Sequence, residues 1–180
     1  MHKKIIIVFL ALGISFISNG AAASTHAKSL QNLDMNEIMF AQMMIPHHKQ
    51  AITMSEIALK KSRNQGILKI SKQIKDMQSS EISQLTYWLK ATNSSMTMDH
   101  DMKMSGMLTK NELNSLNRAS GADFDKKFLT LMIKHHQGAI EMLDLISDSN
   151  NAEAMALGKS IKNTQSKEIN NMKQLLKKIK

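Results

Sequence analysis

One stretch occurs twice in the chain, and this internal repeat restricts the possible folds more than any other feature. FAQMMIPHHKQAITM begins at Phe40, and FLTLMIKHHQGAIEM begins at Phe128. Superposing the two phenylalanines matches Met44 with Met132, His47 with His135, His48 with His136, Ala51 with Ala139, and Met54 with Met142. The repeat predicts one structural unit built twice, with four of the seven histidines at equivalent positions.

The periodicity of the repeat is helical, and a second match follows each copy. At about 100° per residue, Met44 centres an apolar face that has His47 on one margin and His48 on the other. Further along, IKDMQSSEI and IKNTQSKEI match around Ile74 and Ile161. Each copy is therefore a helical hairpin, and two hairpins can bury the apolar faces that one alone cannot. We expect an all-α fold, a four-helix bundle of two repeated hairpins with a Met-rich connection between them.

The chain after its first residues has the length of one domain with a single core, which we place at 24–180. Its parts are repeat one at 34–92, a Met/His-rich linker at 93–108, a short helix at 109–120, and repeat two at 121–180. The long helices are expected at 34–62, 67–91, 123–148 and 151–180. A tight turn is expected at 64–66, and Pro46 is expected to bend the first helix. Asp34 and Thr109 each precede a glutamate by three residues, which predicts two capping boxes.

Residues 1–23 have the pattern of a signal peptide. Lys3 and Lys4 are followed by an apolar run and by the small residues Ala21–Ala23. The run is short for a membrane span. We expect cleavage after Ala23, with Ala21 and Ala22 as alternatives, a periplasmic or secreted protein, and no transmembrane span after cleavage. An uncleaved anchor is the other interpretation.

Composition narrows the chemistry. The chain has no cysteine and sixteen methionines, so a soft metal ion could be bound only through thioether sulfur. The formal charge is +9, and it becomes +7 without Lys3 and Lys4. Lysines cluster at the C-terminus, where cations stabilise a helix end. An exported chain with one Trp and one Tyr gives no reason to expect nucleic acid as a partner.

The histidine pairs are the first candidate metal site. A lone histidine on an apolar helix face is more often structural, but each pair here has methionine one turn before it and two turns after it. Imidazole together with thioether suits copper. The candidate ligands are Met43, Met44, His47, His48, Met54, Met132, His135, His136 and Met142. Glu81 and Glu168 are expected to accept a histidine N–H and orient the ring, or else to face solvent.

The linker is the second candidate site. Methionine usually fills cores, but the turn residues and charges of this segment predict an exposed loop without a helical stripe. Closely spaced methionines near a histidine can surround a soft monovalent ion. The candidate ligands in the linker are Met96, Met98, His100, Met102, Met104 and Met107.

The doubled pattern M-I-x-H-H-x-x-A-I-x-M, with the later QSSEI and QSKEI, resembles a family of exported helical proteins. The family is catalogued as domain of unknown function 305 and includes CopM-type copper-binding proteins. The resemblance extends over nearly all of 24–180. It implies a ferritin-like four-helix bundle and, for some members, copper binding by methionine and histidine in copper tolerance. The ligands that it implies are Met44, His47, His48, Met54, Met132, His135, His136 and Met142.

The sequence therefore predicts a periplasmic or secreted copper-binding protein, not an enzyme, that sequesters or transfers copper. Cu(I) is the preferred ion, Cu(II) and silver are further candidates, and a copper-exporting or copper-accepting protein is a candidate partner. Because ligation needs neutral imidazole, we expect binding to weaken below about pH 6. Two alternatives stay open: a structural or partner-binding bundle without metal, and a di-iron ferritin-like oxidase. The oxidase would need Glu-x-x-His pairs on facing helices, and the chain contains none.

Overall fold

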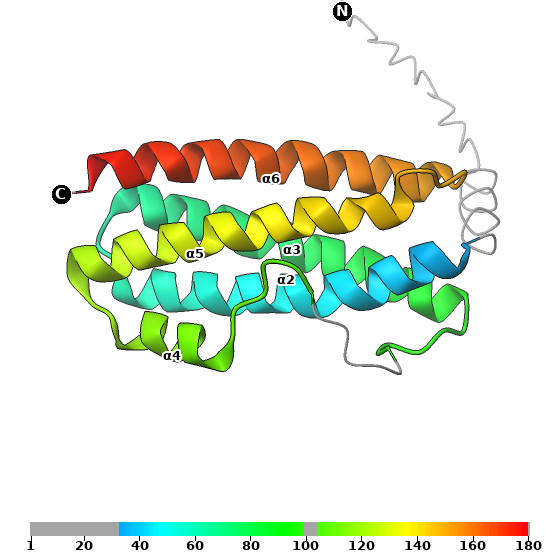
Figure 1. Ribbon diagram of the computed structural model, residues 1–180, viewed down its shortest axis with the longest axis horizontal. Coiled ribbons are helices and arrows are strands. Elements are labelled where there is room, and N and C mark those ends of the chain that lie inside the picture. Colours follow the sequence, from blue (N-terminus) through cyan, green and yellow to red (C-terminus); the bar gives the residue numbers. More distant parts are fainter. Residues whose placement is uncertain (1–32, 99–103, 180) are drawn as a thin grey trace, which may run out of the picture.

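The computed structural model describes residues 33–98 and 104–179, and this part of the chain contains helices and no β-strand. The long helices run alongside one another as a bundle (Figure 1). The helices are α2 (Met35–Lys61), α3 (Gln65–Ala91), α4 (Lys110–Arg118), α5 (Gly121–Glu141) and α6 (Ala152–Lys178), and a 3-10 helix, η1 (Met142–Ile146), continues α5. The predicted all-α bundle of two hairpins is confirmed.

Side-chain caps define where the helices begin. Asp34 accepts a hydrogen bond from the backbone N–H of Glu37, and the Glu37 carboxylate accepts one from the N–H of Asp34 at 2.6 Å. Thr109 and Glu112 form the same reciprocal pair at the start of α4. Both capping boxes predicted from the sequence are present, and each satisfies backbone donors that the first turn leaves free.

Two details of the long helices differ from the prediction. Asn64 caps α3 by accepting from backbone N–H groups, so Gln65 and Gly66 lie inside the helix and not in a turn. The predicted single helix at 123–148 is interrupted, because α5 ends at Glu141 and the chain continues as η1. The repeats therefore differ locally: Met54 lies in a continuous α-helix, whereas its equivalent Met142 begins the 3-10 segment.

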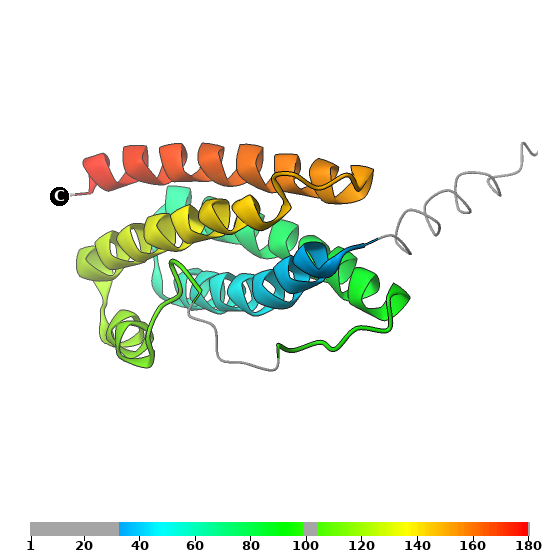
Figure 2. The same ribbon diagram turned by 45° about the vertical axis from the view of Figure 1, so that its right-hand side comes forward.

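The hairpins α2–α3 and α5–α6 pack with α2 and α5 adjacent and antiparallel (Figures 1 and 2). One hydrophobic cluster joins the C-terminal half of α2 to the N-terminal half of α5, and another joins the opposite halves. At the crossing, the ring centroids of the equivalent residues His47 and His135 lie 3.7 Å apart. Contact between equivalent residues indicates a pseudo-twofold axis through this pair.

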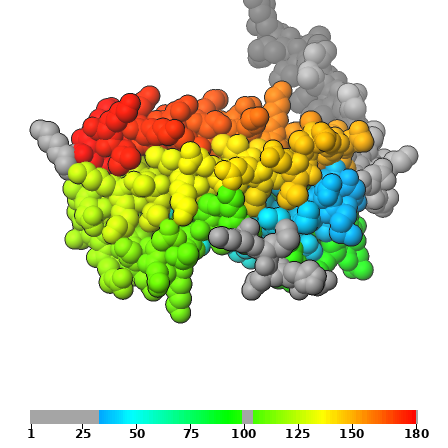
Figure 3. All heavy atoms as spheres, viewed as in Figure 1, coloured from blue at the N-terminus to red at the C-terminus, as the bar shows by residue number. Residues whose placement is uncertain are grey.

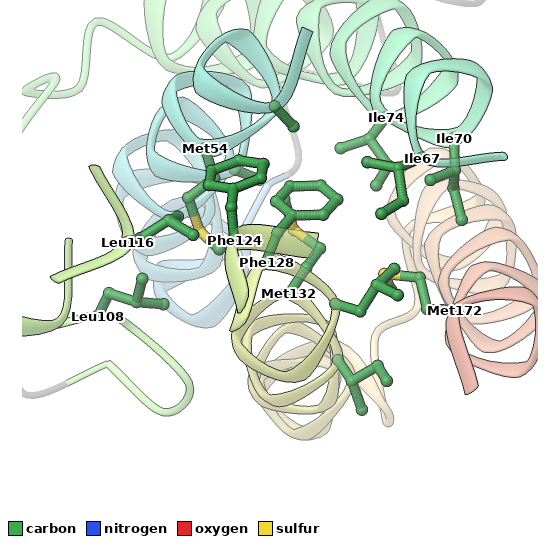
Figure 4. Close-up of a cluster of buried hydrophobic side chains, with 14 of the residues drawn as sticks. Met54, Ile67, Ile70, Ile74, Leu108, Leu116, Phe124, Phe128, Met132 and Met172 are labelled. Atoms are coloured by element: carbon green, nitrogen blue, oxygen red, sulfur yellow. The ribbon is translucent and has the colours of Figure 1, made fainter. Parts of the chain in front are cut away.

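The first hydrophobic cluster fills the end of the bundle next to α4 (Figure 4). Phe124 and Phe128 of α5 stack there with centroids 6.2 Å apart, between Met54 of α2 and Ile67 of α3. Leu116 of α4 also packs into this cluster. The short helix is thus held on the bundle by burial of apolar surface, which stabilises by about 25 cal/mol per Å².

The second hydrophobic cluster, centred on Phe40, Met44 and Trp88, fills the other end of the bundle. On α2 this cluster stops at Ile45, and the first cluster starts at Ala51. The paired histidines lie between the two clusters on α2 and likewise on α5. A buried polar layer therefore crosses an otherwise apolar core.

Some predictions fall outside the described residues, namely the signal peptide at 1–23 and the linker residues His100 and Met102. Among the residues that are described, no helix is both long enough and apolar enough to span a membrane.

Candidate metal centre

The four paired histidines are fully buried in the middle of the bundle. The rings of His47 and His135 are tilted by 38° to each other at a centroid distance of 3.7 Å. The rings within one pair are farther apart, 6.5 Å for His47–His48 and 6.4 Å for His135–His136. This separation follows from helix geometry, because adjacent residues point in different directions. One histidine of each pair faces the other repeat, and its neighbour faces the second helix of its own hairpin.

In each pair, the histidine that faces the second helix of its own hairpin contacts a buried glutamate of that helix. His136 Nε2–H donates to Glu168 Oε2 at 2.8 Å. In the first repeat, His48 Nε2 lies 2.8 Å from Glu81 Oε2, but neither atom has a partner in hydrogen-bonding alignment. The two repeats therefore share the contact, and only the second holds it as a well-aligned hydrogen bond.

Burial keeps the inner pair of imidazoles neutral. Loss of hydration lowers the pKa of His47 from 6.5 to about 3, and repulsion from His48 adds to the effect. Burial likewise lowers the pKa of His135 well below its usual value, with a further contribution from His47. Both rings are therefore neutral over the whole physiological range and keep a nitrogen lone pair that can bind a metal ion.

Hydrogen bonds identify which nitrogen holds that lone pair. His47 Nε2–H donates to the carbonyl oxygen of Ser105 at 3.1 Å, and His136 Nε2–H donates to Glu168. Nδ1 of each of these rings is buried without a hydrogen-bond partner among the described residues. A buried acceptor without a partner is costly. The partners on Nε2 thus leave Nδ1 as the ligand atom, as second-shell groups do at known metal centres.

Methionines from three segments gather in the second hydrophobic cluster beside the histidine layer. α2 contributes three, the linker contributes two, and η1 contributes one. These residues are Met39, Met43, Met44, Met98, Met104 and Met142. Met54 and Met132 lie on the other side of the layer, in the first cluster, and are fully buried. The pseudo-twofold axis therefore separates equivalent methionines into opposite clusters.

The described parts of the linker, 93–98 and 104–108, form a loop with both exposed and half-buried residues, and residues 104–108 contact the bundle. Among the described methionines of the linker, Met98, Met104 and Met107 are half-buried, and Met96, at 40% exposure, is the exposed one. Residues 104–108, which we call the strap, fill the seam between α2 and α5 (Figure 3). The predicted linker site and the predicted histidine site are thus neighbours.

Two residues hold the strap on the bundle. The Gln50 amide of α2 accepts the Leu108 N–H at 2.7 Å and donates to its carbonyl at 3.0 Å. On α5, Gly138 leaves room for the strap backbone: a Cβ atom at this position would lie 2.1 Å from the carbonyl oxygen of Ser105. Gly106 has φ +76°, and a Cβ atom there would lie 2.8 Å from the carbonyl oxygen of Lys134 on α5. The backbone of the strap consequently reaches His47.

Neither Gln50 nor Gly138 was singled out from the sequence, although a signal was present. They occupy equivalent positions in HHKQAI and HHQGAI, where the histidines, the alanine and the isoleucine agree and the two positions between them differ. A difference within an otherwise similar repeat indicates a position where the two copies make different contacts. Here one copy clamps the strap by hydrogen bonds, and the other provides space for it.

The chemistry of the layer depends on mixed ligands. Within the described part of the chain, no three His, Asp or Glu side chains gather in an arrangement suited to a metal ion. A metal centre at the layer would therefore combine imidazole nitrogen with methionine sulfur from the adjoining clusters. Such a set favours a soft, low-charge cation over Mg²⁺ or Ca²⁺, which prefer oxygen ligands.

Comparison with known proteins agrees with the fold. The family model of DUF305, a domain of unknown function, matches residues 37–176, a range that includes both histidine pairs. No curated protein matches the chain significantly. A DUF305 protein of Streptomyces coelicolor, named as secreted, has a TM-score of 0.74 at 24% identity, with 78% of this chain and 91% of that protein covered. At this identity the likeness shows the fold alone.

Two further structures are more similar in sequence. A DUF305 fragment from Deinococcus radiodurans has a TM-score of 0.74 at 27% identity, over 79% of this chain and 96% of its own. CopM in its Cu(I)-bound form has a TM-score of 0.66 at 30% identity, over 78% of this chain and 95% of its own. CopM is also known in silver-bound, Cu(II)-bound and apo forms. The resemblance noted in the sequence is confirmed, and the chain belongs to the DUF305 family.

Proposed function

We propose that this protein is exported, binds copper with a preference for Cu(I), and sequesters the ion or passes it to a partner in copper tolerance. Silver would bind in the same way because Ag(I) has the same preference for soft ligands. Cu(II) would depend more on the imidazoles. The partner would be a protein that exports or accepts copper. This is a binding role without a chemical reaction on a substrate.

The observation that carries the proposal is that buried, neutral imidazoles lie next to a cluster of methionine side chains in the middle of the bundle. Burial holds the pKa of His47 at about 3, so protons do not compete for the ring at neutral pH. Methionines of α2, η1 and the linker pack together beside it. Sixteen methionines in a chain without cysteine supply soft ligands where no thiolate exists. The copper- and silver-bound forms of CopM, at about the same fold, support the same ion class.

The predicted ligands divide into three groups under this proposal. The inner site comprises the paired histidines with Met43, Met44 and Met142, and Glu81 and Glu168 orient His48 and His136. Met54 and Met132 are candidates on the opposite side of the layer. The linker ligands Met96, Met98, His100, Met102, Met104 and Met107 either join the inner site through the strap or form a separate, more exposed one.

The test is a competition titration with a Cu(I) chelator under anaerobic conditions, on the protein without its first 23 residues. We expect the double variant His47→Gln, His135→Gln to lose at least about 100-fold in affinity, because loss of second-shell groups alone costs 10–100-fold. Glutamine keeps a polar side chain of similar length, so the fold should persist, and circular dichroism checks this.

Two matched controls separate the sites. Lys49→Gln changes an exposed residue next to the layer on α2 and should leave affinity unchanged. His100→Gln removes the linker histidine and reports whether the linker binds a separate ion, through a change in stoichiometry. If the parent protein takes up no Cu(I) or Ag(I), the remaining interpretation is a metal-free structural or partner-binding bundle.

A further inference from the structure

Among the described residues that form the polar layer, the two glutamates have the largest exposed fractions. The four histidines have no exposed surface, whereas Glu81 and Glu168 are 6% and 8% exposed. On the side of α2 and α5, the strap covers the layer. The Ser105 carbonyl accepts a hydrogen bond from His47, and the glycines Gly106 and Gly138 let the strap pack closely against α5. The two carboxylates lie on the opposite side of the layer, on α3 and α6, and offer an ion a polar path to the histidines that the strap does not cover.

α3 and α6 pack least closely of the four neighbouring helix pairs. The seam between them contains a groove of about 390 Å³, and Glu168 forms part of its wall. The same carboxylate accepts a hydrogen bond from His136 Nε2–H at 2.8 Å, within the histidine layer. Glu168 thus contacts both the groove and the histidines. Gln78 and Gln165, one turn from the two carboxylates, are 2% exposed and have no hydrogen-bond partner among the described residues.

Met77 lies in the wall of this groove and is 45% exposed. It precedes Glu81 by four residues on α3, so the two side chains share one face of the helix one turn apart. Its equivalent in the second repeat, Thr164, lines the same groove without a sulfur atom. Met77 is thus an exposed thioether one turn from the carboxylate that contacts His48.

The charges favour this groove over its neighbour on the same seam. A second hollow, of about 260 Å³, is lined by Lys69 and Lys178 and by no acidic residue. The groove at Met77 contains the acidic residues Asp76 and Glu168 and the single base Lys167. A cation is repelled at the lysine-lined hollow and attracted at the groove beside Met77, where Lys167 is the one opposing charge on the wall.

We propose that the groove between α3 and α6 is the route by which a soft monovalent cation reaches the histidine layer, with Met77 as the transient ligand at its mouth and Glu168 as the relay to His136. This route rests on the proposed function, because it serves the same ion. A route residue differs from a ligand of the final site in a measurable way. It changes the rates of uptake and release together and leaves the equilibrium affinity unaltered.

The experiment is anaerobic stopped-flow uptake of Cu(I) from a weak Cu(I)–chelator complex, paired with an equilibrium competition titration of the same samples. Met77→Leu removes the sulfur and keeps the volume. We expect its uptake rate constant to fall at least about threefold with unchanged affinity, and Lys167→Gln to raise that constant. Met155→Leu is the matched control, because Met155 is 46% exposed on α6 outside this groove, and it should change neither quantity.

Each other outcome contradicts the route. An unchanged uptake rate in Met77→Leu overturns it, and so does a loss of affinity, which would make Met77 a ligand of the final site. An equal slowing in Met155→Leu would indicate a general effect of surface methionines and would also overturn it. If the parent protein shows no equilibrium binding of Cu(I), the proposed function itself fails. Normal binding with an unaltered rate rejects the route alone.

Discussion

Gly138→Ala is expected to displace the strap and to destabilise the protein by about 2 kcal/mol or more, as overpacking of a close contact does. The new Cβ atom would lie 2.1 Å from the Ser105 carbonyl oxygen and 2.6 Å from the Gly106 nitrogen. Both are backbone atoms, so no side chain can rotate away. Chemical denaturation measures the loss of stability, and limited proteolysis within 104–108 reports the displaced strap.

The matched control is Gly158→Ala, the same substitution inside another long helix. Its Cβ would meet side chains and no backbone: the nearest atom is the end of Ile146, at 3.0 Å, which can move, and Leu143 lies at 3.9 Å. Alanine favours helix over glycine by up to about 1 kcal/mol, so this variant should be as stable as the parent or more stable. If Gly138→Ala behaved like Gly158→Ala, the contact between strap and α5 would not exist in solution.

The second large effect is a loss of stability of the metal-free protein as the pH falls below 6.5. His47 has a pKa of about 3 when folded and 6.5 when unfolded, so between these values the unfolded chain binds more protons than the folded one. Stability from this group is complete above 6.5 and decreases as pH falls toward 3. The decrease is about 1.4 kcal/mol per pH unit for one such histidine, and His135 acts in the same direction.

Denaturation at several pH values between about 7 and 5 measures this slope, with an expected loss of about 2 kcal/mol per histidine over that interval. His47→Gln removes one titrating group and should flatten the curve. Glu56, an exposed residue that pairs with Lys75, offers a control, since Glu56→Gln should leave the slope above pH 5 unchanged. A parent protein equally stable at both ends of the interval would show that the inner histidines are hydrated.

The same burial changes one expectation from the sequence. Ordinary imidazole would begin to lose metal to protons below about pH 6. Because the pKa of His47 lies near 3, competition at this ring should begin only at lower pH. The acid limit of copper binding is then set by unfolding of the bundle rather than by protonation of a folded site. The two causes separate in one experiment, since unfolding removes the helical signal and protonation alone does not.

Local and periodic features were predictable because they depend on residues close together in the chain. The capping boxes at Asp34 and Thr109 each join a residue to one three positions later. The divergence of His47 and His48 follows from helix geometry alone. The bounds of α5 were not predictable, since the 3-10 segment from Met142 forms in a helix pattern that continues unbroken in the sequence.

How the linker packs on the bundle could not be predicted from local sequence patterns. Methionine spacing marks 96–107 as unusual, but the same spacing suits a free loop or a packed one. Gln50 and Gly138 decide between them, and each acts on residues far away in the chain. A hydrogen bond to Leu108 and a missing Cβ have no periodic signature. Their effect exists only once α2 and α5 lie side by side.

The sequence by itself determined that two equivalent hairpins form, that each presents one histidine to either side, and that soft ligation must use methionine. Helical periodicity and composition carry this information at short range. The tertiary structure alone decided that equivalent histidines meet at 3.7 Å, that the strap covers one side of their layer, and that carboxylates of α3 and α6 border the other. Those outcomes depend on how the hairpins pack, because packing sets which distant groups share one buried volume.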